Sequence, residues 1–312
     1  MGFENIIGNE EVKRILTKSI VSGKQSHSYL FLGPSGIGKT IFAREFAKML
    51  LCDDTTIEGN TCNTCKSCIE FDGNNHPDYR EIKPDGNTIK IEQIRMMQEK
   101  VIEKPVISKQ KVYVIKDADS MTKEAQNSLL KTLEEPPEYV TIILVAANES
   151  LLLTTIKSRC TKIVFKKIED NLLKEYLEKT EDKMNLSDTM LQIFDGSIAR
   201  ALSLKDKEEE YRQVERLFLT VDKTNPIDLI NHAEVLYKNK EDILELLEYA
   251  NLILYQQAIG NLEQSKKYRK SMEIVEKTKG KLKANANFDM CIDNLLLEVW
   301  EEINEKYSRS EV

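Results

Sequence analysis

The stretch Gly33-Pro34-Ser35-Gly36-Ile37-Gly38-Lys39-Thr40 decides how the first half of this chain is interpreted. It fits the pattern G-x-x-x-x-G-K-[ST], in which backbone N–H groups at the start of a helix cradle phosphate oxygens. In this pattern Lys39 reaches the β- and γ-phosphates and Thr40 holds Mg²⁺. The motif therefore predicts a site for ATP or ADP. The alternative is a tight strand–helix turn that holds no ligand.

The residues around this loop supply the context that the motif requires. The apolar run Tyr29–Leu32 precedes it, and a helix is expected over Thr40–Leu51. Two further buried strands are predicted at Lys111–Ile115 and Val140–Ala147, and a helix is predicted between them at Thr122–Glu135. Strands that are apolar almost throughout are typical of parallel sheets with helices on both faces. We therefore expect an α/β domain over residues 1–165.

After Phe165 the strand signals stop and helical periodicity takes over. Three short helices are expected at Asp170–Lys179, Ser187–Phe194 and Ile198–Leu204, followed by the charged run Lys205–Glu210. Apolar stripes over Asp242–Ala258 and Phe288–Ile303 indicate a helical bundle. The pattern therefore predicts that the chain divides near residue 165 and again near residue 208.

The end of the strand Lys111–Ile115 argues against efficient ATP hydrolysis. A working ATPase needs acidic side chains there to hold Mg²⁺ and to orient water. Lys116 stands where an Asp is usual, and a lysine cannot ligate Mg²⁺. Asp117 follows, where a Glu base is usual; a register shift would bring Asp117 to the metal and leave the base role vacant. Binding without hydrolysis is therefore favoured, and a relic loop is the other possibility.

Four of the six cysteines lie close together in the sequence, at Cys52, Cys62, Cys65 and Cys68. Their C-x-x-C steps bring sulfur atoms to one point, and four thiolates satisfy a tetrahedral structural Zn²⁺ ion. We therefore predict a zinc knuckle over about residues 52–68, whose folding energy comes from the metal. An iron–sulfur cluster or redox dithiols are the alternatives. Cys160 and Cys291 are interpreted as ordinary thiols.

Length and composition limit the number of domains and the class of protein. The chain has 312 residues, 41% of them hydrophobic and 31% charged, which suits two or three folded domains and excludes a disordered chain or a membrane bundle. The net charge of −7 gives no bulk attraction to nucleic acid, so contact with DNA would be local or through partners. The first residues lack the features of a signal peptide, and we predict a cytoplasmic protein without membrane contact.

Ser158-Arg159-Cys160 follows the last apolar strand. A lone arginine at such a place is normally a surface charge. In a ring of phosphate-loop domains, however, an arginine here can reach the γ-phosphate of a neighbour's ATP and stabilise the transition state in trans. On local sequence alone, the surface charge is the favoured interpretation of Arg159.

Taken together, these residues resemble the AAA+ family and, within it, the delta-prime group of bacterial DNA polymerase III clamp-loader subunits. The resemblance spans nearly the whole chain and is strongest over residues 1–204. Besides the loop and the cysteines, it is carried by Asn5–Asn9, His27–Phe31, Asn75–Asp78, Pro84–Gly86, Ile89–Arg95, Asp117–Asp119, Asn127–Lys131, Leu133–Pro136 and Ser158–Cys160.

This resemblance implies an α/β P-loop domain with a zinc insert, a three-helix lid over residues 166–208, and an all-α collar over residues 209–312 that joins a five-subunit ring. It implies that Arg159 is a trans arginine finger and that the four clustered cysteines hold structural zinc. The implied partners are tau/gamma-type ATPase subunits, a delta-type subunit, the sliding clamp, and primed DNA met through the assembled complex. The chain would then belong to the DNA polymerase III holoenzyme without carrying a polymerase active site.

Three departures from the ATPase subunits of this family fit a subunit that completes its neighbour's site. They are Lys116, Ala147 at a position where a polar sensor is usual, and Arg200 one place later than the second sensor. Two alternatives remain open. One is an active AAA+ ATPase, either the motor subunit or another replication remodeller. The other is a small-molecule phosphotransferase, which lacks a recognisable acceptor site.

Overall fold

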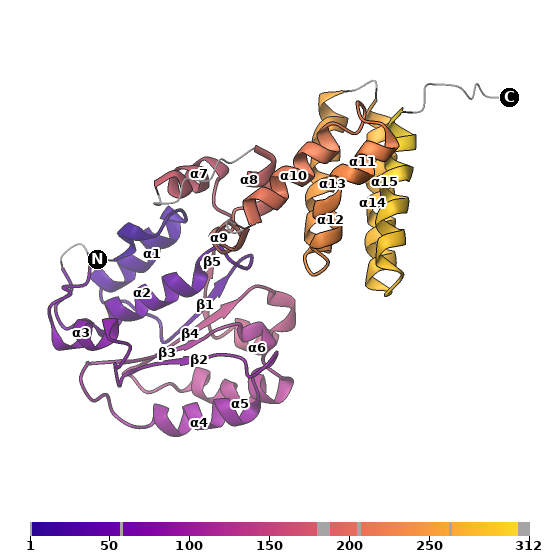
Figure 1. The fold of residues 1–312 in the computed structure, drawn as a ribbon. Helices are drawn as coiled ribbons and strands as arrows, with labels where there is room; N and C mark the ends of the chain where they lie inside the picture. Colours follow the sequence, from indigo (N-terminus) through magenta and orange to yellow (C-terminus); the bar gives the residue numbers. More distant parts are fainter. Residues whose placement is uncertain (1, 57–58, 180–187, 205–206, 262–263, 305–312) are drawn as a thin grey trace. The chain divides into compact units, whose positions relative to one another are not determined.

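A computed structural model describes residues 2–56, 59–179, 188–204, 207–261 and 264–304 (Figure 1). The chain forms two compact units, Met1–Tyr176 with Gly196–Ala199, and Leu177–Asp195 with Arg200–Val312. The expected division near residues 165 and 208 stays a prediction. Ser187, the first residue of one expected helix, and Lys205, the first of the charged run, lie outside the described residues.

The first unit is built on a five-stranded sheet in the order β2-β3-β4-β1-β5, and every neighbouring pair is parallel. The strands are β1 (Ser28–Leu32), β2 (Tyr79–Ile82), β3 (Lys111–Ile115), β4 (Val140–Ala146) and β5 (Thr161–Val164). β1, β3 and β4 are buried along their whole length because they occupy the centre of the sheet. The predicted parallel α/β fold is therefore confirmed.

Helices cover both faces of this sheet (Figure 1). Successive side chains of a strand point to opposite faces, so β1 contributes Phe31 to one core and Leu30 to the other. The Phe31 core also holds buried residues of α1 (Glu10–Val21) and α2 (Lys39–Leu51), and the Leu30 core those of α4 (Ile91–Val101) and α5 (Lys123–Glu134). Both α2 and α5 begin within one residue of the positions expected from the sequence.

Short elements complete the first unit. They are α3 (Lys66–Asp72), α6 (Thr154–Lys157) and three 3₁₀ turns at Phe3–Asn5, Ala118–Ser120 and Glu149–Leu151. The boundary between the two units, at Tyr176 and Leu177, falls within helix α7 (Asp170–Lys179). The carboxyl ends of β1 and β3 lead into the loop Gly33–Thr40 and into the turn that contains Lys116 and Asp117.

The second unit is helical throughout its described part. It contains α8 (Asp188–Phe194), most of α9 (Ile198–Leu204), α10 (Glu208–Leu219), α11 (Pro226–His232), α12 (Glu234–Lys238), α13 (Ile243–Gly260), α14 (Ser265–Lys283) and α15 (Phe288–Asn304). α13 packs on α10 and α14, and α14 also packs on α15. Between helices, the Trp300 Nε1–H donates to the Thr224 carbonyl oxygen at 2.6 Å. The predicted helical bundle is confirmed, and none of the described helices is long and apolar enough to cross a membrane.

Candidate nucleotide site and cysteine cluster

The predicted phosphate loop lies between the buried end of β1 and the start of α2. Gly36 and Gly38 adopt φ angles of +76° and +92°, which side chains rarely tolerate. A Cβ atom on Gly36 would lie 2.1 Å from the Ser197 Oγ, whereas one on Gly38 would meet nothing within 4 Å. The loop is therefore packed against Ser197 on one side and open in front of Gly38, at the beginning of the helix. The sequence did not predict the contact with Ser197, because this residue lies far from Gly36 along the chain.

The side chain of Lys39 folds back onto its own loop. Its ammonium group donates to the carbonyl oxygens of Gly33 at 2.7 Å and Pro34 at 2.6 Å, and only 7% of the residue is exposed. Burial lowers the pKa of Lys39, while the carboxylates of Asp119 and Asp117 act in the opposite direction. Two carbonyl oxygens of the loop therefore already accept hydrogen bonds from the Lys39 ammonium group. A bound phosphate group would have to compete with them for this ammonium group.

The strand end that should carry Mg²⁺ ligands is organised differently. The Lys116 Nζ forms an ion pair with the Glu81 carboxylate of β2 at 2.5 Å. Glu81 also accepts a hydrogen bond from the Tyr79 hydroxyl at 2.6 Å. Burial would raise the pKa of Glu81, but the bonds from Lys116 and Tyr79 outweigh it and lower that pKa. Lys116 is thus part of a charge network with the edge strand, a partner that the sequence did not predict.

The two aspartates after Lys116 have separate roles. Asp117 is exposed, has a φ of +48°, and precedes the 3₁₀ turn Ala118–Ser120. The Asp119 carboxylate accepts hydrogen bonds from the backbone N–H groups of Ala147 at 3.1 Å and Asn148 at 2.7 Å. Asp119 therefore ties the end of β3 to the end of β4, while Asp117 stays available near the loop. Sequence reasoning singled out Asp117 and missed the role of Asp119.

Arg159 lies just before β5, and its side chain is one-third exposed. Its Nη1 donates to the Thr155 carbonyl oxygen at 2.9 Å, and its Nη2 forms an ion pair with Glu134 at 2.6 Å. Among the described residues, no hydrogen bond or ion pair joins Arg159 to the loop Gly33–Thr40 of the same chain. The guanidinium is therefore held at the end of α5, apart from the chain's own phosphate loop. Next to it, burial raises the pKa of the Cys160 thiol to about 12.

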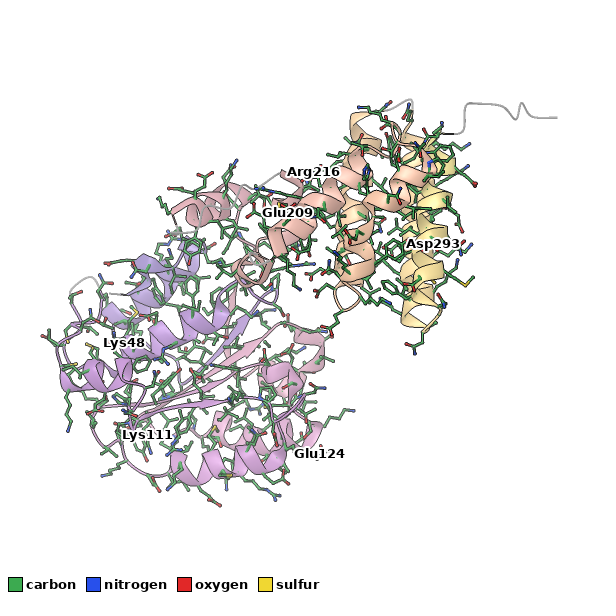
Figure 2. All side chains as sticks on the ribbon, viewed as in Figure 1. Lys48, Lys111, Glu124, Glu209, Arg216 and Asp293 are labelled. Atoms are coloured by element: carbon green, nitrogen blue, oxygen red, sulfur yellow. The ribbon has the colours of Figure 1, made fainter. Side chains whose placement is uncertain are left out.

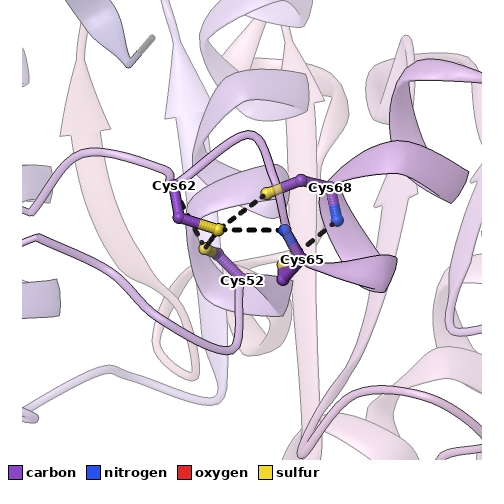
Figure 3. A group of neighbouring side chains, drawn as sticks. All are labelled: Cys52, Cys62, Cys65 and Cys68. Carbon is purple, nitrogen blue, oxygen red and sulfur yellow. Dashed lines mark hydrogen bonds between the residues drawn. The ribbon is translucent and has the colours of Figure 1, made fainter.

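The four clustered cysteines converge as predicted (Figure 3). All four Sγ atoms lie within 4.8 Å of one another, with Cys52–Cys62 at 3.6 Å and Cys62–Cys68 at 4.0 Å. A Zn–S bond of about 2.3 Å in a tetrahedron places sulfur atoms about 3.8 Å apart, so these distances fit a zinc ion. Backbone N–H groups point at the sulfurs, for example from Cys65 to Cys62 at 3.3 Å. Hydrogen bonds from the backbone of Thr64 and Cys65 lower the pKa of Cys62 to about 6.

A buried polar network supports this cluster. The Ser67 and Ser108 hydroxyls both contact the His76 Nε2, at 2.9 and 3.1 Å, and the Leu51 carbonyl oxygen. Burial lowers the pKa of His76. Beside it, the Asp78 carboxylate accepts three backbone hydrogen bonds, from Val106, Ile107 and Ser108 at 2.7 to 3.0 Å.

Lys48 of α2, labelled in Figure 2, connects to the same region. Its ammonium group contacts the side chains of Asp72 and Asn63 at 2.7 and 2.8 Å. Helix α3 begins next to the cluster, where the Cys65 side chain accepts from the Cys68 N–H. The sequence did not predict this network.

The chain is similar to known subunits of bacterial DNA polymerase III. A family model described as DNA polymerase III, delta subunit, matches residues 8–169, just over half of the chain. The delta′ subunit of DNA polymerase III from Bacillus subtilis is 34% identical over 200 residues, covering 64% of this chain and 59% of that protein. The tau subunit from the same organism is 32% identical over 256 residues, covering 78% of this chain and 45% of that protein.

Among solved structures, a DNA polymerase III gamma subunit-related protein from Thermotoga maritima is 20% identical with a TM-score of 0.48. The match covers 94% of this chain and 99% of that one. The chain spans less than two thirds of the length of the curated relatives named above.

Proposed function

The chain belongs to the DNA polymerase III delta-subunit family of AAA+ clamp-loader proteins, and on this premise we propose that it is a delta-prime-type subunit. It takes a place in the loader ring, presents Arg159 to the ATP of a neighbouring subunit, and supports loading of the sliding clamp on primed DNA. Its partners are a tau/gamma-type ATPase, a delta-type subunit and the clamp. It works in the cytoplasm and hydrolyses little ATP itself.

The observation that carries this proposal is the ion pair between Lys116 and Glu81. A carboxylate at position 116 would hold Mg²⁺ in a hydrolysing subunit. Here the position holds a cation that is already neutralised by the edge strand at 2.5 Å. Asp119 is occupied by two backbone N–H groups. Of the two aspartates after Lys116, Asp117 is the one that stays exposed near the loop, and one carboxylate does not serve both as metal ligand and as base.

The surroundings of Arg159 support a role toward another subunit. The pair with Glu134 joins side chains that are 33% and 48% exposed, and such pairs contribute at most about 1 kcal/mol. Exchanging Glu134 for a phosphate of a neighbour therefore costs little. Arginine suits this task because its planar fork matches phosphate oxygens.

The test is the DNA-stimulated ATPase of the reconstituted loader containing Arg159→Ala. A trans arginine accelerates phosphoryl transfer by about 10³- to 10⁵-fold, so turnover at the dependent site should almost vanish. Arg14→Ala, an exposed arginine of α1, is the matched control and should leave the rate unchanged. Sedimentation of each complex checks that the loader assembles with either variant. An unchanged rate with Arg159→Ala in an intact complex refutes the arginine-finger assignment.

An active AAA+ ATPase is the second candidate, and the complete loop with Lys39 and Thr40 favours it. ATP turnover by the purified chain, abolished by Lys39→Ala, would establish this alternative. Binding of labelled ATP and ADP to the isolated chain, with and without Mg²⁺, separates an occupied loop from a relic.

We also propose that Cys52, Cys62, Cys65 and Cys68 hold one structural Zn²⁺ ion. Four thiolates leave no open coordination position, so the metal fixes the fold of the insert and takes no part in chemistry. Metal analysis of the purified protein should find about one zinc per chain. Cys62→Ser should lose it, whereas Cys160→Ser, which changes a thiol outside the cluster, should keep it. A folded protein without metal contradicts the assignment.

A further inference from the structure

Helix α14 carries a concentration of positive charge that the proposed function does not use. Its 19 residues include eight lysines and arginines and only two glutamates. The chain as a whole has a net charge of −7. The helix packs on α13 and α15 through Tyr268, Ser271 and Val275, which are buried. The exposed side of the helix is therefore a strongly basic surface on an acidic protein.

The charges follow one face of the helix. Lys266, Arg269, Lys270, Lys277 and Lys281, here called the basic ridge, are separated by steps that keep them within one third of the helix circumference. The stretch from Lys266 to Lys281 spans about 22 Å at the rise of an α-helix. The exposed residues of α14 are all charged or glycine, namely Lys266, Arg269, Lys270, Glu273, Glu276, Lys277, Gly280 and Lys283.

Two cations of α14 outside the ridge are used inside the unit. Lys279 forms ion pairs with Glu276 at 2.8 Å and with Glu248 at 3.3 Å. Lys267 donates to the carbonyl oxygen of Ile303 at 2.9 Å. These bonds link α14 to α13 and α15 without using Lys266, Arg269 or Lys277.

The cations of the ridge are mostly uncompensated. Lys270 pairs with Glu302 at 3.0 Å, but both side chains are partly exposed, so the pair is weak. Across the part of the chain that the structure describes, the other four ridge residues have no ion-pair partner within 4.0 Å. Glu273 lies on the same face and offsets part of this charge, so the ridge keeps a net positive charge that solvent and counterions screen and that a polyanion would neutralise.

We propose that the basic ridge binds the phosphate backbone of DNA without reading its sequence. A protein partner is disfavoured, because interface cores are apolar and poor in lysine, whereas the exposed residues of α14 include no apolar one. A DNA strand advances about 3.4 Å per phosphate, so the ridge faces about six phosphates of one strand. Gly280 lies between Lys277 and Lys281 with open space beyond its Cα atom, which lets a phosphate approach the helix closely.

This contact is separate from the phosphate loop and from Arg159, because it lies wholly in the second unit. In the proposed function the subunit acts through protein partners. The basic ridge would give the subunit a DNA contact of its own. The failure of one assignment therefore leaves the other intact.

The test is the binding of the full chain to fluorescently labelled primed DNA, followed by anisotropy over a series of salt concentrations. The test variant combines Lys266→Gln, Arg269→Gln and Lys277→Gln. The matched control combines Arg216→Gln, Lys223→Gln and Lys238→Gln, which remove the same charge from exposed positions elsewhere in the second unit; Arg216 is labelled in Figure 2. Circular dichroism verifies that both variants fold.

Removing one cation that neutralises a phosphate should reduce the slope of log K against log salt by about 0.7 to 0.9. The ridge variant should therefore bind at least about tenfold more weakly at low salt, with a slope smaller by about 2 to 3. The control should bind as the unmodified chain does. Absence of binding by the unmodified chain, or equal effects of the two variants, overturns the proposal. If DNA binding is unaffected but the ridge variant no longer assembles with the other loader subunits, an acidic protein surface is the partner and the proposal is wrong.

Discussion

Replacing Asp78 by alanine should strongly destabilise the first unit. The Asp78 carboxylate is 2% exposed and accepts backbone hydrogen bonds from Val106, Ile107 and Ser108 at 2.7, 2.8 and 3.0 Å. Hydrogen bonds to a charged group contribute about 1.5–3 kcal/mol each. Because water can enter the space left by the side chain, the lower value of about 1.5 kcal/mol applies, and three bonds give a loss of about 4.5 kcal/mol in the free energy of unfolding.

The loss can be measured as a shift in the thermal midpoint of the first unit. For a unit of this size 1 kcal/mol corresponds to about 2–4 °C, so the midpoint should fall by about 9–18 °C. Asp78→Asn keeps the shape but turns an amide N–H toward backbone donors, and it should still cost at least about 2 kcal/mol. The effect should extend to the cysteine cluster, because Ser108 contacts His76 and the end of α2.

The control is Asp85→Ala, which removes an exposed carboxylate of the same unit. A surface substitution of this kind changes stability by less than about 0.5 kcal/mol. If Asp78→Ala lowered the midpoint no more than Asp85→Ala does, the three backbone bonds would not be stabilising the segment that they join. The reasoning from buried hydrogen bonds to stability would then be refuted for this site.

Three further outcomes are expected. A strong zinc chelator, or Cys62→Ser, should lower the thermal midpoint of the first unit and leave that of the second unit unchanged, as followed by calorimetry. Burial lowers the pKa of His76, so its contribution to stability is complete above its unfolded pKa of about 6.5 and is lost as the pH falls toward the lower folded value. The midpoint of the first unit should therefore drop more steeply with acid in the unmodified protein than in His76→Gln; parallel curves would contradict this. Trp300→Phe leaves the Thr224 carbonyl oxygen without its donor and should cost the second unit about 1–2 kcal/mol in denaturant unfolding; a loss below the error of the measurement would count against it.

The central part of the sheet was predictable from the sequence, and its edges were not. β1, β3 and β4 are continuous apolar runs because helices cover both of their faces. β2 and β5 lie at the edges, carry exposed residues such as Arg80 and Lys162, and lack the pattern that identifies a strand. Their position depends on pairing with β3 and β1, which is a long-range property of the fold.

The candidate site was predicted to a similar extent. The loop Gly33–Thr40 and the convergence of the four cysteines follow from short spacings, so local sequence contained the signal. The substitution at Lys116 was visible, but its pairing with Glu81 was not, because 35 residues separate them in the chain. The same holds for Ser197 against Gly36. Zinc, nucleotide and the role of Arg159 stay predictions.

The polar edge strands of the sheet bear on how the chain avoids misassembly. An unpaired strand edge offers backbone N–H and C=O groups to any other strand that meets it, and flat apolar edges therefore promote aggregation. β2 presents Arg80 and Glu81, and β5 presents Thr161 and Lys162, so a second strand arriving at either edge must desolvate charged or polar side chains. Chains that meet before folding is complete are therefore less prone to pair through the edges of their sheets.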